Sequence, residues 1–141
     1  MSPESNGPVE ALHIDECMIL LQSEQLGRLA VAVHHLPEIF PVNYIVNDGK
    51  ILFRTSEGTK LLLLTINAQV AFEVDSFTKG EAWSVVVKGT ARAIESQQEI
   101  WEANKLPLTP WIPTLKYVFV EIEPSEVTGR RFNIGPEPDR D

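Results

Sequence analysis

The chain has 141 residues, 43% of them hydrophobic, and a formal net charge of −8 at pH 7. This length favours one domain. The acidic balance argues against a nucleic-acid-binding protein, which normally presents a basic face to phosphates. The longest strongly apolar run, at 61–64, is too short to span a membrane. Cys17 is the only cysteine, which excludes an internal disulfide and fits a reducing cytoplasm.

The two ends of the chain differ in composition from the part between them. Residues 1–10 carry two acids and two prolines and lack the basic start and apolar stretch of a signal peptide. We therefore expect a disordered leader over 1–12, one folded domain over 13–132, and a flexible tail over 133–141.

The first half of the domain predicts one helix and three strands. Apolar spacing predicts a helix over 15–25. Residues 28–34 alternate between apolar and other side chains, which indicates a half-buried strand. After Pro37, residues 39–46 form a second alternating strand. The sequence Asn47-Asp48-Gly49 then predicts a tight hairpin turn, with a return strand over 51–55.

The second half alternates between short helices and strands. Ser96 and Glu99 have the spacing of a capping box, which predicts a helix over 97–104. Prolines keep 106–113 irregular. The other predicted elements are a helix over 60–67 and strands over 69–75, 83–93 and 116–123. About six strands, mostly linked by hairpins, with three short helices predict a mainly β protein, a small closed or split barrel.

The loop at 54–60 has the composition of a phosphate-binding segment. It gathers the cations Arg54 and Lys60 with the hydroxyls of Thr55, Ser56 and Thr59. The start of the following helix would add unpaired amides and a positive dipole end, which attract phosphate. Composition alone favours the alternative, a surface turn with a serine cap and two solvated cations.

Two further segments could contact a ligand. Asn43 is the only polar side chain in the strand at 39–46, and Pro41 in that strand suggests an edge or a bulge where a planar ligand could lie. Trp83 and Ser84 open a later strand and face opposite sides, with core packing as the alternative for Trp83. His34 and His35 also face opposite sides, which argues against a shared metal. The sequence has no hydrolase motif and no convincing carboxylate pair.

These segments together resemble the pyridoxamine 5'-phosphate oxidase-like family of flavin-binding split barrels, above all its short actinobacterial-type members. The likeness spans about 15–132 and depends on the order and spacing of its parts. The matching parts are GRLAV at 27–31, FPVNY at 40–44, FRT at 53–55, GTK at 58–60, VAFEVD at 70–75, WSV at 83–85 and EVTGRRF at 126–132.

The resemblance implies a six-stranded antiparallel split β-barrel that forms a homodimer, with FMN in a groove at the dimer interface. It implies phosphate contacts from three residues, contacts along the ring and ribityl chain from six, and contacts near the polar edge of the ring from two. The phosphate contacts would come from Ser56, Thr59 and Lys60. The ring and ribityl contacts would come from Pro41, Val42, Asn43, Tyr44, Arg54 and Thr55, and the contacts near the polar edge from Trp83 and Ser84.

The resemblance also limits the activity. True pyridoxamine 5'-phosphate oxidases carry a C-terminal segment of Trp-Arg-x-x-Arg type that binds the substrate, whereas this chain has Gly129-Arg130-Arg131-Phe132 and no tryptophan there. We therefore expect an FMN-binding oxidoreductase with a small-molecule electron donor and acceptor, and not a true oxidase of that kind. The alternatives are a deazaflavin-dependent reductase, a flavin or haem carrier or sensor, and a structural dimer without a ligand.

Overall fold

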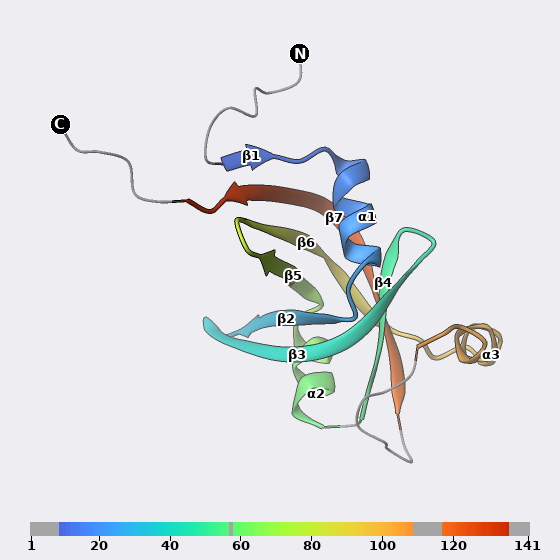
Figure 1. Cartoon of the computed structure of the whole chain (residues 1–141). Coiled ribbons are helices and arrows are strands. Elements are labelled where there is room, and N and C mark those ends of the chain that lie inside the picture. The colour runs from blue at the N-terminus through green and yellow to red at the C-terminus, as the bar shows by residue number, and fades with distance from the viewer. Residues whose placement is uncertain (1–8, 57, 109–116, 136–141) are drawn as a thin grey trace.

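The computed structural model describes residues 9–56, 58–108 and 117–135, which form seven strands and three helices (Figure 1). In chain order the elements are β1 (Val9–Ala11), α1 (Ile14–Gln22), β2 (Leu26–Val33), β3 (Leu36–Asn47), β4 (Lys50–Thr55), α2 (Thr59–Ile66), β5 (Gln69–Thr78), β6 (Glu81–Ala93), α3 (Gln97–Asn104) and β7 (Val118–Asn133).

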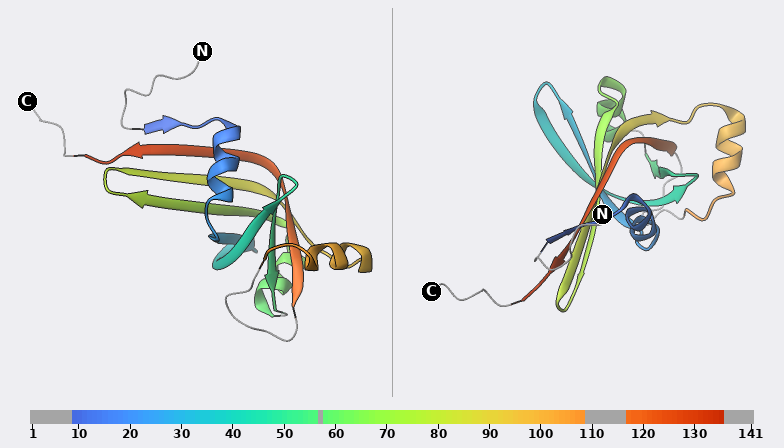
Figure 2. Two further views of the ribbon diagram at one scale, coloured as in Figure 1. Left: turned by 45° about the vertical axis from the view of Figure 1, so that its right-hand side comes forward. Right: turned by 90° about the horizontal axis from the view of Figure 1, so that it is seen from above.

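Six of the strands close into an antiparallel barrel, as predicted. The sheet order is β1-β7-β4-β3-β2-β5-β6, and an additional pairing of β6 with β7 closes the ring. Seen from above, β5, β6 and the end of β7 run out as a ribbon on one side, and α3 lies on the other (Figure 2). Closure removes most free sheet edges, which would otherwise be open to pairing with other chains.

Strand β7 is longer than the predicted strand at 116–123, because it continues through a bulge to Asn133. Its register against β6 shifts between Lys88 and Gly89, which pair with Glu126 and Pro124. Proline has no amide to donate to a sheet, so a bulge is the usual way for a strand to pass it. The Ser125 hydroxyl donates to the Lys88 carbonyl at 3.0 Å.

The expectation of a disordered leader over 1–12 is wrong at its end. Val9 to Ala11 form β1, which pairs with 130–132 of β7. This pairing joins segments more than a hundred residues apart, so local composition could not predict it. Residues 1–8 lie outside the described part of the chain. So do residues 136–141 of the expected tail, while Asn133 belongs to β7 and the Ile134 amide donates to the Gly80 carbonyl at 2.8 Å.

The hairpin turns are tight. At the predicted turn, Asp48 and Gly49 have φ angles of 54° and 74°, the left-handed conformation that a two-residue hairpin loop needs. A second such loop joins β2 to β3, where His34 and His35 have φ angles of 53° and 64°. The two histidines therefore form the turn itself, and β3 already begins at Leu36.

The barrel core is built from the inward residues of every barrel strand and is covered at one end by α1. Cys17 and Leu21 of α1 are fully buried in it. Tyr44 and Phe72 pack edge to face with their ring centroids 4.9 Å apart, and the Tyr44 hydroxyl donates to the Leu21 carbonyl at 2.6 Å. Burial raises the pKa of Tyr44 well above its usual range, so its hydroxyl stays a proton donor.

Replacing Tyr44 with phenylalanine should lower the free energy of unfolding by about 1–3 kcal/mol, because it leaves the buried Leu21 carbonyl without its donor. Chemical denaturation measures the change. Tyr117→Phe is the control: its hydroxyl bonds to Asn104 at an exposed site, where the loss should stay within about 0.5 kcal/mol. Equal losses in the free energy of unfolding for the two variants would contradict the role of Tyr44 in the core.

The three helices occur close to where they were predicted. The capping box forms as expected, since the Ser96 hydroxyl accepts the Glu99 amide at 3.0 Å and α3 spans 97–104. Of the segment predicted to be irregular, residues 109–113 lie outside the described part. Among the described residues, no helix is long and apolar enough to cross a membrane.

Candidate functional site

The barrel is split between β3 and β4. Their pairing covers 44–47 of β3 and ends where Tyr44 meets Phe53. Beyond that point β3 pairs only with β2, while Arg54 and Thr55 of β4 pair with Phe119 and Val118 of β7. Within the described residues, β3 and β4 thus do not pair with each other beyond this point, and their facing edges offer backbone donors and acceptors.

Six of the predicted site residues lie at this split. Continuing the register past Tyr44 would place three residues of β3 opposite three residues that end and follow β4, but these pairs do not form. The free edge at Pro41 agrees with the prediction from the proline. The six residues are Pro41, Val42 and Asn43 on one side and Arg54, Thr55 and Ser56 on the other.

Helix α2 begins at the mouth of the split without a side-chain cap. Its N-cap is Gly58, and neither Ser56 nor Thr59 caps it, which corrects the alternative of a serine-capped turn. The first amides of a helix have no partner within the helix, so they remain available to a ligand or to water. Thr59 is the first helical residue, and the neighbouring residue 57 is outside the described part.

Lys60 is held close to β3. Its ammonium nitrogen lies 5.5 Å from the centroid of the Phe40 ring, within the range of a cation–π contact. The side chain is half-buried, and this burial lowers its pKa from the usual value, because desolvation disfavours the charged form. A bound anion would offset that cost, so the position suits a phosphate group.

Arg54 and Thr55 point to opposite faces of β4. Thr55 is buried on the side of Phe53 and the barrel core, and its hydroxyl donates to the Ser56 carbonyl at 3.2 Å. The Arg54 guanidinium carbon instead lies 3.5 Å above the Tyr117 ring, and its Nε is buried without a hydrogen-bond partner among the described residues. A buried unpaired donor is costly, which marks Arg54 as a residue suited to an additional acceptor.

Sequence reasoning missed Tyr117, which holds Arg54 in place. The Tyr117 hydroxyl donates to Asn104 Oδ1 of α3 at 2.8 Å, and the ring packs edge to face on Phe119 at 5.4 Å. These contacts join Arg54 of β4, Asn104 of α3, and Tyr117 just before β7. No local signal in the sequence points to it.

The side chains at 41–44 divide between two faces of β3. Val42 and Tyr44 are buried in the core, at 5% and 1% exposure. The side chains of Pro41 and Asn43 point the other way. Val42 and Tyr44 can therefore contact a ligand in the split only through their backbones.

Trp83 and Ser84 do not meet the split within one chain. They belong to β6, which is separated from β3 by β2 and β5 and from β4 by β7. Along β7 they pair with Arg131 and Arg130, whereas β4 pairs with 118–122. Trp83 packs against the core, in agreement with the alternative weighed above, and Ser84 faces outward. The structure thus brings nine of the eleven predicted residues, Pro41–Tyr44, Arg54–Ser56, Thr59 and Lys60, to one region and leaves these two elsewhere.

The outer face of the sheet carries an ionic cluster that was not predicted. Arg28 on β2 lies 2.9 Å from Glu73 and 3.2 Å from Asp75, both on β5. Burial and the neighbouring Asp75 carboxylate raise the pKa of Glu73 to about 7, although Arg28 opposes this rise. The two carboxylates share one side of β5 because they are two residues apart.

Protein stability should therefore depend on Glu73. A folded-state pKa raised from 4.5 to about 7 means that the folded protein holds this proton more tightly, so stability falls as pH rises from about 4.5 to 7. Glu73→Gln should remove this fall and stabilise the protein at pH 8 by about 1 kcal/mol after allowance for solvent screening. Denaturation from pH 4 to pH 8 measures it. A stability curve with the same slope in wild type and variant would contradict the assignment.

The chain belongs to the family whose model is described as pyridoxamine 5'-phosphate oxidase, which matches residues 13–131. It is 44% identical over 96 residues to the uncharacterized protein Rv3129 of Mycobacterium tuberculosis, an alignment that covers 68% of this chain and 87% of that protein.

Among the solved structures with the same fold are two that are at least 40% identical to this chain. One, from Corynebacterium glutamicum, is 44% identical with a TM-score of 0.83 and covers 94% of this chain and 100% of its own. The other is an FAD-binding protein from Mycobacterium smegmatis, 40% identical with a TM-score of 0.79, which covers 89% of this chain and 99% of its own. The family and the split-barrel fold expected from the sequence are thereby confirmed.

Proposed function

We propose that this chain is an FMN-binding flavoprotein whose flavin occupies the split between β3 and β4 at a homodimer interface. The observation that carries the proposal is the separation of the facing edges of β3 and β4, with Lys60 and an uncapped helix start at their mouth. A flavin mononucleotide has a planar ring that needs hydrogen bonds along an edge and a phosphate that needs cations and amides. The similarity to an FAD-binding protein supports a flavin as the class of ligand.

The residues at the split fit the parts of this cofactor. Lys60, Ser56 and Thr59 would hold the phosphate, together with the first amides of α2. Arg54 has an unpaired buried donor to offer to the ring or ribityl chain, beside Thr55. The ring would be lined by Pro41 and Asn43 through their side chains, and by Val42 and Tyr44 through their backbones.

A homodimer would complete the site. Trp83 and Ser84 pair with Arg131 and Arg130 of β7, whereas β4 pairs with 118–122 of β7, so they lie away from the split of their own chain and a second copy would supply them to its flavin. The outer face of the sheet, which carries Ser84, is the surface that would meet the other copy. Size-exclusion chromatography with light scattering tests this, and a monomer that still binds flavin tightly would contradict it.

The flavin would supply the chemistry, taking up a hydride or electrons from a small-molecule donor and returning them to an acceptor. The chain's own residues would bind and orient it. Among the described residues at the split, no side chain is placed as a nucleophile, and the segment at 129–132 lacks the tryptophan of the substrate-binding segment in true pyridoxamine 5'-phosphate oxidases. We therefore propose that this protein is an oxidoreductase that acts on a substrate other than pyridoxamine 5'-phosphate.

Titration of flavin-free protein with FMN, FAD and the deazaflavin cofactor tests the choice of cofactor. We expect quenching of flavin fluorescence with FMN at the lowest concentrations. Tighter binding of FAD or of the deazaflavin would overturn FMN in favour of that cofactor. Binding of haem alone, or tight flavin binding with no turnover of nicotinamide reductants, would favour a carrier or sensor.

A further inference from the structure

A pocket of about 180 Å³ lies between helix α2 and the barrel strands β6 and β7. Helices α1 and α2 lie on opposite sides of the barrel (Figures 1 and 2), and the space beside α2 is only partly filled by side chains. The pocket is lined by Leu61, Leu64 and Thr65 of α2, Ala91 and Ala93 of β6, Glu95, and Val120 of β7.

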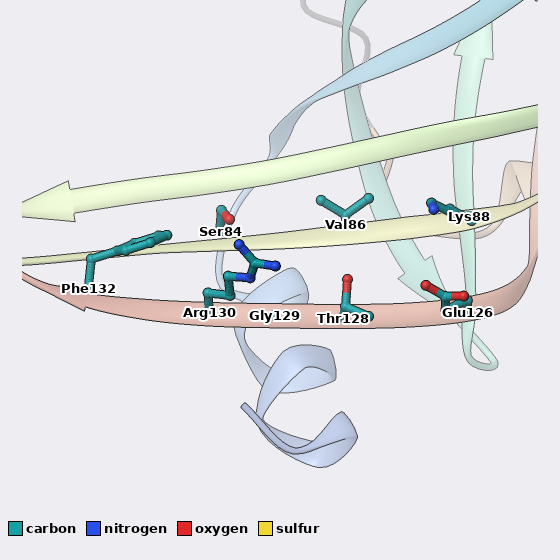
Figure 3. A pocket seen from close by; sticks show the side chains of 8 residues that line it. All are labelled: Ser84, Val86, Lys88, Glu126, Thr128, Gly129, Arg130 and Phe132. Carbon is teal, nitrogen blue, oxygen red and sulfur yellow. The ribbon is translucent and has the colours of Figure 1, made fainter. Parts of the chain in front are cut away.

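Small side chains on β6 make room for this pocket. The inward residues of the strand shrink along its length, from Val85 and Val87 to Ala91 and Ala93. The groove that contains Ser84 lies on the opposite side of β6 (Figure 3), because neighbouring residues of a strand point to opposite sides. The pocket therefore belongs to the inner side of the sheet, away from the outer face that would meet a second copy.

The floor of the pocket is apolar. Leu64, Ala91 and Val120 are buried and belong to the barrel core. An apolar cavity of about 150 Å³ can hold a molecule the size of benzene. The pocket is thus large enough for an apolar group of about five or six carbon atoms.

The rim of the pocket offers hydrogen-bond acceptors. Glu95 and Thr65 are the exposed polar residues there. The Thr65 hydroxyl already donates to the Leu61 carbonyl at 2.9 Å, so its oxygen can still accept a hydrogen bond. The backbone amides of Ala91 and Ile94 are likewise bound to carbonyls, each at 2.8 Å. A ligand at this rim would therefore have to supply the donor.

Glu95 is a carboxylate that has no cation beside it. Among the residues that the structure describes, it makes no ion pair or side-chain hydrogen bond, whereas Glu99 and Glu121 are both bound to Arg92. The preceding residue, Ile94, belongs to the small core that α3 covers, and Glu95 lines the pocket beside α2 instead. A free carboxylate at the rim of an apolar pocket, in a protein with a net charge of −8, favours a cation with an apolar body.

From this arrangement we infer that the pocket is a second ligand site, which binds a small primary amine with an apolar body. Glu95 and Thr65 accept hydrogen bonds from the ammonium group. Leu64, Ala91 and Val120 contact the body. The inference goes beyond the flavin and does not depend on it, because none of the residues assigned to the flavin lines this pocket.

The test uses the full-length protein and three probes that share one alkyl chain: n-pentylamine, pentan-1-ol and pentanoate. Amide chemical shifts in two-dimensional NMR report where each probe binds and how tightly. The amine should shift the amides of 61–65 and 91–95 and bind about fivefold more tightly than the alcohol, the size of effect expected for an ion pair at an exposed carboxylate. High salt should reduce this difference, and pentanoate should bind more weakly than the alcohol.

Two variants separate the charge from the cavity. Glu95→Gln should weaken the amine about fivefold and leave the affinity for pentan-1-ol unchanged, because only the ion pair is lost. Ala93→Leu should weaken the amine and the alcohol alike, because the larger side chain fills the pocket.

Two control variants make the outcome specific. Glu38→Gln removes an equal charge from an exposed position of β3, outside the pocket, and should leave amine binding unchanged. Lys60→Ala, which tests the flavin site, should not weaken amine binding, so the two proposals can fail separately. Wild-type amine affinity in Glu95→Gln, equal binding of the amine and pentanoate, or shifts confined to residues outside 61–65 and 91–95 would each overturn the inference.

Discussion

Lys60→Ala should weaken FMN binding by about ten- to a hundredfold, the equivalent of losing one charge-assisted contact to a phosphate. The ammonium group is half-buried at the mouth of the split, beside the uncapped start of α2. Since burial lowers its pKa, a bound phosphate dianion would favour its charged form and be favoured by it in turn. Fluorescence titration at low and high salt measures the loss, which should shrink as salt screens the contact.

Two comparisons separate this contact from general effects. Lys105 also lies over an aromatic ring, 3.1 Å from the centroid of Trp101, but it follows α3 and is none of the residues placed at the split. Lys105→Ala should leave FMN affinity unchanged. Riboflavin lacks the phosphate, so Lys60→Ala should barely alter its binding. If riboflavin and FMN lose affinity equally, Lys60 does not contact the phosphate.

Gly89→Val should destabilise the protein by about 3 kcal/mol or prevent folding. A Cβ atom at this position would lie 2.2 Å from the Glu123 carbonyl oxygen, and backbone on the paired strand cannot move aside as a flexible side chain can. Valine has a higher strand propensity than glycine, so propensity alone would predict that the substitution stabilises the protein. Thermal denaturation decides between them.

Lys88→Ala, at the exposed neighbouring position, is the control for this substitution and should change stability by no more than about 0.5 kcal/mol. Gly89 lies where the β6–β7 register shifts at the bulge, so the clash tests the close approach of the two strands there. A Gly89→Val protein as stable as wild type would mean that this approach is absent.

Local signals in the sequence predicted much of the fold. The capping box at Ser96 set the start of α3, and Asn47-Asp48-Gly49 set the turn between β3 and β4. Alternation identified the strands, since inward and outward residues repeat every two positions. The strand, turn and strand predicted within 40–60 fold back on themselves, and Lys60 lies near the Phe40 ring.

Pairings between distant segments were not predictable in this way. Strand β1 exists because β7 offers it an edge, and β7 passes Pro124 only because β6 accepts a bulge. The stacking of Arg54 on Tyr117 likewise depends on which strands become neighbours. The family resemblance implied that Trp83 and Ser84 lie near the flavin, whereas the structure places them on β6, paired with Arg131 and Arg130 of β7 and away from the split of the same chain.

The central claim, that the split binds a flavin, is tested most directly by the absorbance spectrum of the protein as purified, followed by mass analysis of whatever it releases on denaturation. We predict that the protein shows flavin absorbance bands, that added FMN brings the occupancy of the sites close to saturation, and that the molecule released on denaturation is FMN. A protein that is colourless as purified, and that gains no bound flavin when FMN is added in excess, would contradict the account.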